Sequence, residues 1–135
     1  DRDRMRALAF GDATAKQRLE AIIHPLVGQA IASQATMAKA ANHACAVFDI
    51  PLLVESGRWR QQLDQVLVVD CSTETQIARV MQRSGLQREE VQRIIDQQAS
   101  RAQRAQVADV ILLNEGLDMS ALQAEVKKVA RQFGL

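Results

Sequence analysis

The stretch that decides the fold is Val47-Phe48-Asp49-Ile50-Pro51-Leu52-Leu53-Val54-Glu55. It continues an apolar run over residues 44–50, which is typical of a strand buried on both faces. Pro51 ends that strand because proline has no N–H to donate to a sheet. Ligands of open α/β sheets bind beyond the carboxyl ends of the strands. The stretch therefore predicts a strand followed by a binding loop, with a strand and a solvated loop as the alternative.

Two further apolar runs predict strands at residues 66–69 and 107–113. Helical spacing of apolar residues occupies about forty residues before the first strand and also residues 74–84, 87–106 and 118–133. Strands that alternate with helices predict right-handed crossovers and a parallel sheet. We therefore expect an α/β fold with a parallel core of about three strands. Three strands are few for such a sheet, so we expect that further strands precede Asp1 and that the chain is truncated.

The composition restricts the class of protein. With 135 residues the chain is long enough for one domain with an aliphatic core, since aromatic residues make up only 3%. The net charge of +1 argues against a nucleic-acid partner. No apolar run has the length of a membrane span and no signal peptide is visible, so we expect a cytoplasmic protein without a membrane partner. Cys45 and Cys71 form no C-x-x-C pair and are predicted to be reduced core residues.

Residues 79–104 are rich in arginine, with six arginines against three acids. This pattern fits either a solvated helical face or an arginine-bearing lid that closes over phosphates, because guanidinium groups bind phosphoryl oxygens in pairs. Arg79 and Arg83 are four residues apart, directly after the end of a predicted strand. They should share one helical face, which favours phosphate binding for these two.

Other candidate residues are less specific. His24 precedes Pro25 and could be a helix cap, a core residue, or a contact to a ligand. Asp49 could orient a metal ion or a hydroxyl proton, because phosphoryl transfer needs a carboxylate near both. The chain has no G-x-x-x-x-G-K-[ST] motif, so it lacks the glycine-rich phosphate loop of a nucleotide kinase.

Taken together, four motifs resemble the dephospho-coenzyme A kinase family. They are His-Pro, Pro-Leu-Leu-x-Glu, Gln-x-x-Arg-x-x-x-Arg, and Ala-Asp with a later Asn. The residues that carry the resemblance are Leu19, Glu20, Ile23, His24, Pro25, Pro51, Leu52, Leu53, Val54, Glu55, Asp64, Gln76, Arg79, Arg83, Arg93, Gln97, Ala108, Asp109 and Asn114, with the strand at 66–70.

The resemblance implies a P-loop kinase-like fold in three parts. Residues 1–43 would form a helical coenzyme A-binding region, residues 44–83 and 106–135 an α/β core, and residues 84–105 a helical lid. It implies a transferase that moves the γ-phosphate of ATP, with Mg²⁺, to the ribose 3′-hydroxyl of dephospho-coenzyme A. That reaction is the last step of coenzyme A biosynthesis.

The resemblance also implies roles for single residues. Arg79 and Arg83 would be catalytic, and Asn114 and Gly116 would bind the nucleotide. The substrate would contact His24, Pro25, Leu52, Leu53 and Glu55, and no residue is assigned to a metal. The family's phosphate loop would precede Asp1, so we expect the 135 residues to be inactive alone. The alternative is a noncatalytic α/β module that binds coenzyme A or a partner.

Overall fold

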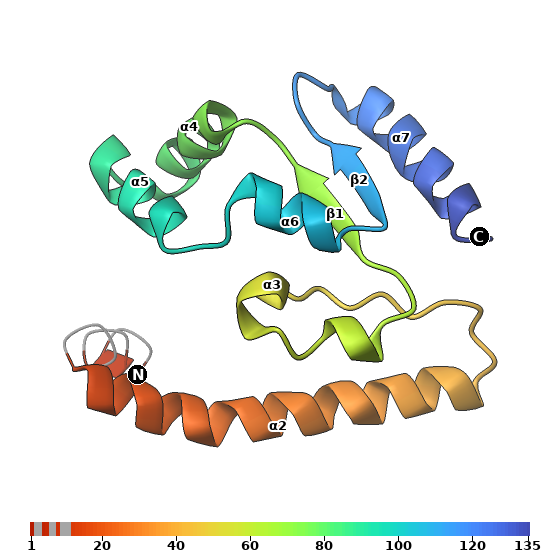
Figure 1. Cartoon of the computed structure of the whole chain (residues 1–135), viewed down its shortest axis with the longest axis horizontal. Helices are drawn as coiled ribbons and strands as arrows, with labels where there is room; N and C mark the ends of the chain where they lie inside the picture. The colour runs from red at the N-terminus through yellow and green to blue at the C-terminus, as the bar shows by residue number, and fades with distance from the viewer. Residues whose placement is uncertain (2–3, 6–7, 9–11) are drawn as a thin grey trace. The chain divides into compact units, whose positions relative to one another are not determined.

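The computed structural model describes residues 1, 4–5, 8 and 12–135, which form two compact units (Figure 1). One unit spans residues 1–47 and the other residues 48–135. The boundary lies between Val47 and Phe48. The division into a coenzyme A-binding region, a core and a lid remains a prediction.

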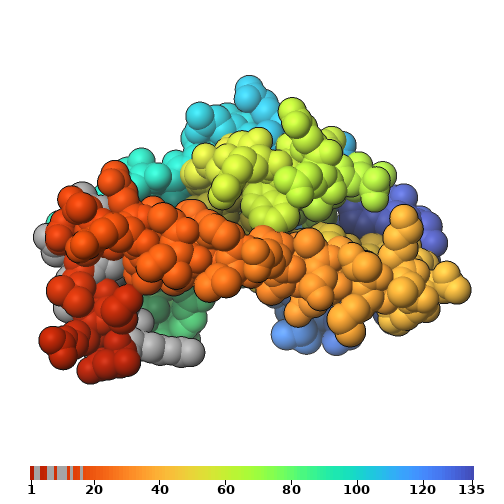
Figure 2. Space-filling view, turned by 90° about the horizontal axis from the view of Figure 1, so that it is seen from below, coloured from red at the N-terminus to blue at the C-terminus, as the bar shows by residue number. Residues whose placement is uncertain are grey.

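The first unit is dominated by one long helix, α2 (Ala13–Ala40). Asp12 begins it, because the Asp12 carboxylate accepts a hydrogen bond from the Thr14 N–H at 2.8 Å. The helix runs without a break past Pro25, although proline cannot supply the helical N–H at that position. Figure 2 shows the whole length of this helix in space-filling form, from red to orange.

The strand predicted at residues 44–50 is wrong, and the described part of the chain holds two strands instead of about three. Residues 44–51 make no backbone hydrogen bond to another described residue. Val47 is 89% exposed, so the run is not buried either. An apolar, β-branched run becomes a strand only where a neighbouring strand supplies backbone partners, and no described segment pairs with this one.

The second unit is an α/β arrangement that contains the remaining elements. In chain order these are α3 (Leu53–Ser56), η1 (Arg60–Gln62), β1 (Leu67–Asp70), α4 (Thr73–Ser84), α5 (Arg88–Asp96), α6 (Arg101–Val107), β2 (Val110–Leu113) and α7 (Met119–Gln132).

The two strands are parallel and lie side by side, with Leu67 opposite Val110 and Asp70 opposite Leu113 (Figure 1). The connection from β1 to β2 passes through α4, α5 and α6, as expected for a crossover between parallel strands. The predicted strands at 66–69 and 107–113 are thus confirmed, although both are only four residues long.

Helix boundaries in this unit follow local chemistry. Ser72 begins α4 by accepting a hydrogen bond from the Thr75 N–H, and Gly85 ends it in a left-handed conformation with φ of 67°. The single helix predicted over residues 87–106 is wrong, because the chain leaves the helical path at residues 97–100. Ser100 then caps α6 by accepting from the Gln103 N–H at 3.2 Å.

The core of the second unit is aliphatic, as the composition predicts. Its buried side chains are Val66, Ile77, Val91 and Leu112, each at most 5% exposed. Helix α4 packs on α5, α6 packs on β1, and α7 packs on β2. Among the described residues, no helix is both long and apolar enough to cross a membrane.

Candidate functional site

The carboxyl ends of β1 and β2 meet at one edge of the sheet, because the strands are parallel and in register. Asp70 is the last residue of β1 and Asn114 directly follows β2. The Asn114 N–H donates to the Asp70 carbonyl at 2.8 Å, which extends the ladder by one bond. Ligands of open parallel sheets bind at this edge. We refer to the polar residues gathered there as the strand-end cluster: Asp70, Ser72, Thr75, Arg79, Arg101, Asn114 and Glu115.

The first contact of the cluster joins Arg79 to Asn114. The Arg79 Nη2 donates to the Asn114 main-chain oxygen at 3.1 Å and lies 3.5 Å from its Oδ1. Arg79 projects from the middle of α4, and Asn114 begins the loop after β2. The structure thus brings together a predicted catalytic arginine and a predicted nucleotide-binding residue, 35 positions apart in sequence.

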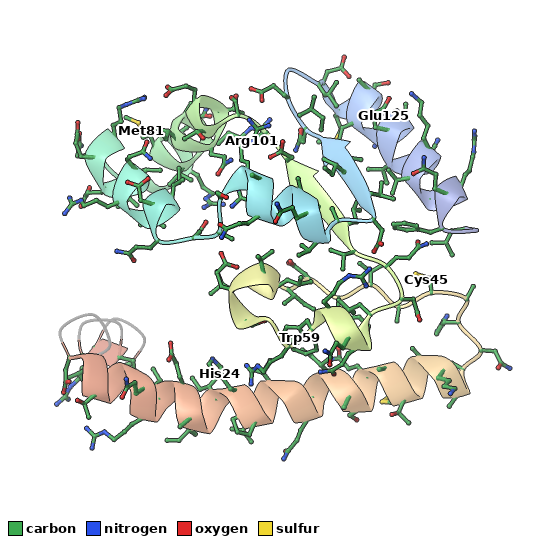
Figure 3. The ribbon with its side chains drawn as sticks, viewed as in Figure 1. His24, Cys45, Trp59, Met81, Arg101 and Glu125 are labelled. Atoms are coloured by element: carbon green, nitrogen blue, oxygen red, sulfur yellow. The ribbon has the colours of Figure 1, made fainter. Side chains whose placement is uncertain are left out.

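The second contact is an ion pair between Arg101 and Asp70. The Arg101 Nε donates to Asp70 Oδ1 at 3.0 Å, and its Nη2 donates to Oδ2. Arg101 projects from the first turn of α6 (Figure 3). The guanidinium lowers the pKa of Asp70 below its ordinary value of 3.8, through the hydrogen bond and then through its charge. The Asp70 carboxylate in turn raises the pKa of Arg101.

The third contact places the Glu115 carboxylate at the start of α4. Its Oε1 accepts from the hydroxyls of Thr75 and Ser72, the latter at 2.8 Å, and its Oε2 accepts from the Ser72 N–H. These three donors lower the pKa of Glu115 from 4.5 to about 2, with Thr75 contributing most. A helix N-terminus stabilises such a negative charge.

This arrangement favours phosphate binding over proton transfer by the two carboxylates. Asp70 and Glu115 are both ionised at neutral pH and engaged by donors within the protein, which makes them poor general bases. Arg79 and Arg101 are exposed at the same sheet edge. Guanidinium groups in this position can bind phosphoryl oxygens and stabilise the charge of a transferring phosphate.

Two predicted residues near the cluster make no cluster contact. Arg83 lies one helical turn after Arg79 and is exposed, and its side chain makes no hydrogen bond or ion pair with another described residue. Gly116 follows Glu115 with φ of 64°, a left-handed conformation that glycine adopts without strain.

The predicted substrate-binding residues are divided between the two units. His24 and Pro25 lie in α2, and both are exposed. Leu52 and Leu53 begin α3, which also carries Glu55. The Glu55 Oε1 accepts a hydrogen bond from the Ala99 N–H at 2.7 Å, so this carboxylate is attached to the turn before α6.

The strand-end cluster does not offer free carboxylate ligands for the Mg²⁺ ion that the family resemblance implies. Among the described residues, no three histidine, cysteine, aspartate or glutamate side chains converge on one point. Asp70 and Glu115 are already engaged by an arginine and by three donors. Magnesium usually binds through one or two carboxylates together with substrate phosphates, and these two carboxylates do not fit that role.

Sequence reasoning missed five residues of the cluster as site residues: Asp70, Ser72, Thr75, Arg101 and Glu115. A signal existed for Asp70, because an acid at the carboxyl end of a predicted strand lies at the ligand-binding edge. Arg101 stood in the arginine-rich stretch without a feature that separated it from its neighbours. The partners of Glu115 lie 40 and 43 positions away, and no local pattern indicates such a contact.

Comparison with known proteins gives consistent matches. A family model described as dephospho-CoA kinase matches residues 1–119. A dephospho-CoA kinase of Albidiferax ferrireducens is 57% identical over all 135 residues, which are 64% of that relative. A dephospho-CoA kinase structure from Campylobacter jejuni has a TM-score of 0.70 at 29% identity, covering 98% of this chain and 64% of its own. A Thermus thermophilus structure has a TM-score of 0.75 at 30% identity, covering 98% of this chain and 66% of its own.

Proposed function

Because the chain belongs to the dephospho-CoA kinase family, we propose that the complete protein containing it transfers the γ-phosphate of ATP to the ribose 3′-hydroxyl of dephospho-coenzyme A. The chain spans 64% of the length of the Albidiferax ferrireducens relative and 53% of that of a Bordetella avium relative. The substrates, and a location in the cytoplasm where coenzyme A would be made, are part of the proposal.

The observation that carries the proposal is the contact between Arg79 and Asn114 at the carboxyl edge of the sheet. It joins two of the sequence motifs that resemble the family, Gln-x-x-Arg-x-x-x-Arg and Ala-Asp with a later Asn. A guanidinium held at this edge lies where a parallel sheet binds nucleotides.

We propose that Arg79 and Arg83 bind the phosphate that is transferred. Little covalent chemistry falls to the protein in phosphoryl transfer, so positioning and charge stabilisation carry most of the catalysis. Asn114 and Gly116 would line the nucleotide side. The dephospho-coenzyme A side would be formed by His24, Pro25, Leu52, Leu53 and Glu55.

The test is an assay of the complete protein with ATP, Mg²⁺ and dephospho-coenzyme A. Formation of coenzyme A and ADP is followed by chromatography, and phosphorus NMR identifies a 3′-phosphomonoester. We expect Arg79→Ala to lower kcat by about 10²-fold or more, as for other lost electrostatic catalysts. Arg79→Lys should recover only part of the rate, because lysine cannot bind two oxygens in a fork.

The matched control is Arg131→Ala, which removes an exposed arginine from the last turn of α7. It should leave kcat unchanged. Wild-type kinetics in Arg79→Ala would contradict the role of Arg79. If the unmodified complete protein binds coenzyme A but forms no product, the noncatalytic binding module replaces the kinase.

A further inference from the structure

The loop after β2, residues 114–118, is fastened to the segment that runs from β1 into α4. Three kinds of contact join the loop to that segment. The Asn114 N–H donates to the Asp70 carbonyl, the Glu115 carboxylate accepts from Ser72 and Thr75, and the Asn114 carbonyl accepts from Arg79. All three cross between segments that are about forty positions apart in sequence.

Glu115 is the part of this connection that uses the most donors. It accepts one main-chain N–H and two hydroxyls. The pKa of Glu115 is lowered to about 2, so its carboxylate is ionised at neutral pH and its hydrogen bonds are charge-assisted. Such hydrogen bonds are about twice as strong as neutral ones. Glu115 directly follows Asn114, so its attachment restrains the main-chain oxygen that receives the Arg79 guanidinium.

The Glu115 contact is more than a cap for α4. Ser72 already caps that helix, because its hydroxyl oxygen accepts from the Thr75 N–H at 3.2 Å. The same hydroxyl donates to Glu115, so the carboxylate binds to a helix start where the Thr75 N–H already has an acceptor. What Glu115 adds is the attachment of the 114–118 loop.

We propose that Glu115 is a positioning residue for Arg79. Its carboxylate fastens the 114–118 loop to Ser72 and Thr75, and the fastened loop presents the Asn114 oxygen that orients the Arg79 side chain. This inference rests on the proposed function, in which Arg79 binds the transferred phosphate. An arginine that is already oriented needs no reorganisation when the phosphate arrives, and preorganisation of this kind lowers the barrier.

The test is a double-mutant cycle in the complete protein, with Glu115→Ala, Arg79→Ala and the pair. Misplacement of a catalytic group by mutation of a supporting residue can cost up to about 10²-fold in rate, and we expect about a tenfold loss of kcat in Glu115→Ala. In the Arg79→Ala background the same substitution should change kcat by less than about twofold, because the group that Glu115 positions is gone. Equal factors in both backgrounds would overturn the proposal, since they describe a merely structural role.

A second variant guards against poor folding of Glu115→Ala. Thr75→Val removes one hydroxyl donor to Glu115 and conserves the shape of the side chain. It should lower kcat as Glu115→Ala does, but by a smaller factor. This loss should also vanish in the Arg79→Ala background. A Thr75→Val variant with an undiminished kcat would count against the proposal.

Hydrogen exchange supplies a readout that does not depend on activity. Amide exchange at residues 114–116 should become faster in Glu115→Ala and in Thr75→Val. The control Glu125→Ala breaks an exposed pair with Lys128 on α7 and should leave those amides unchanged. Unchanged exchange in both test variants would refute the attachment itself. If the unmodified protein is inactive, the proposed function fails, and exchange still decides whether Glu115 holds the loop.

Discussion

Arg101 holds Asp70 with two of its nitrogens, so that the first turn of α6 is tied to the last residue of β1. The Asp70 side chain is 17% exposed and that of Arg101 is 48% exposed. The pair is therefore partly shielded from water on the carboxylate side. A paired, forked contact of this kind is more than a surface ion pair, which contributes little to stability.

Asp70→Asn should lower the free energy of unfolding by about 1 kcal/mol, because the neutral amide loses the charge-assisted fork. The measurement is urea unfolding of the complete protein at low and high salt, and the difference from wild type should shrink as salt rises. The control Glu125→Gln changes an exposed pair on α7 and should stay near wild type. Wild-type stability of Asp70→Asn at low salt would show that the ion pair contributes nothing.

Stability should fall in acid because of Glu115. Its folded pKa of about 2 is below the ordinary value of 4.5, so the folded state favours the charged form. The contribution is fully present above about pH 4.5 and is lost as the pH falls toward 2. Urea midpoints measured from pH 6 to pH 3 should fall less steeply for Glu115→Gln than for wild type. The urea midpoint of Glu115→Gln should still fall somewhat with pH, because the pKa of Asp70 is lowered too. Identical slopes of midpoint against pH in the variant and in wild type would contradict the prediction.

Two glycines should respond to alanine in opposite directions. Gly85 has φ of 67° and an added Cβ would meet no atom within 4 Å, so Gly85→Ala introduces backbone strain without a clash. It should lower the free energy of unfolding by about 1 kcal/mol. Gly28 lies inside α2 and also has free space, so Gly28→Ala should raise it by about 0.5–1 kcal/mol. Thermal unfolding followed by circular dichroism checks both signs, and a stabilised Gly85→Ala would contradict the conformational argument.

Substitution of Arg83 tests a role in the reaction without disturbing the fold, because the Arg83 side chain is exposed and makes no hydrogen bond or ion pair with another described residue. If it binds the transferred phosphate after closure at Gly85, Arg83→Ala should lower kcat by about 10²-fold or more. Arg83→Lys should recover part of the rate, because it keeps the charge without the fork. Unfolding should be unaffected in both. Steady-state assays with ATP and dephospho-coenzyme A decide this, and a wild-type kcat in Arg83→Ala would end the assignment.

The parts of the fold that sequence predicted well are those set by neighbouring residues. The helix at residues 74–84 and the apolar run before Asp70 each follow from chemistry within a few positions, and the structure shows Ser72 and Gly85 at the two ends of that helix. The strand at 44–50 was wrong because pairing depends on a distant partner that composition does not reveal. The break at 97–100 was missed although a local signal existed, because Ser100 and Gln103 form a capping box at the start of α6.

The candidate site shows the same limit. The Arg79–Asn114 contact joins two residues that the motifs singled out. Glu115 and Arg101 belong to no motif, and their partners lie 43 and 31 positions away. Asp109 is instructive in another way. The Asp109 carboxylate accepts from the Val66 N–H at 2.7 Å and from the Arg60 guanidinium at 3.0 Å. This motif residue therefore lies where the two strands begin, at the end of the sheet opposite the strand-end cluster. The family resemblance indicated Asp109 but did not indicate at which end of the sheet it lies.

The bond from Glu55 to Ala99 constrains its two positions unequally. At position 55 the contact requires a particular side chain, an acceptor of the right length on α3. At position 99 it requires only a main-chain N–H, which every amino acid except proline supplies. A library of substitutions would therefore find position 55 restrictive and position 99 permissive except for proline. Sequences that keep this bond would keep an acceptor at position 55 but could differ at position 99.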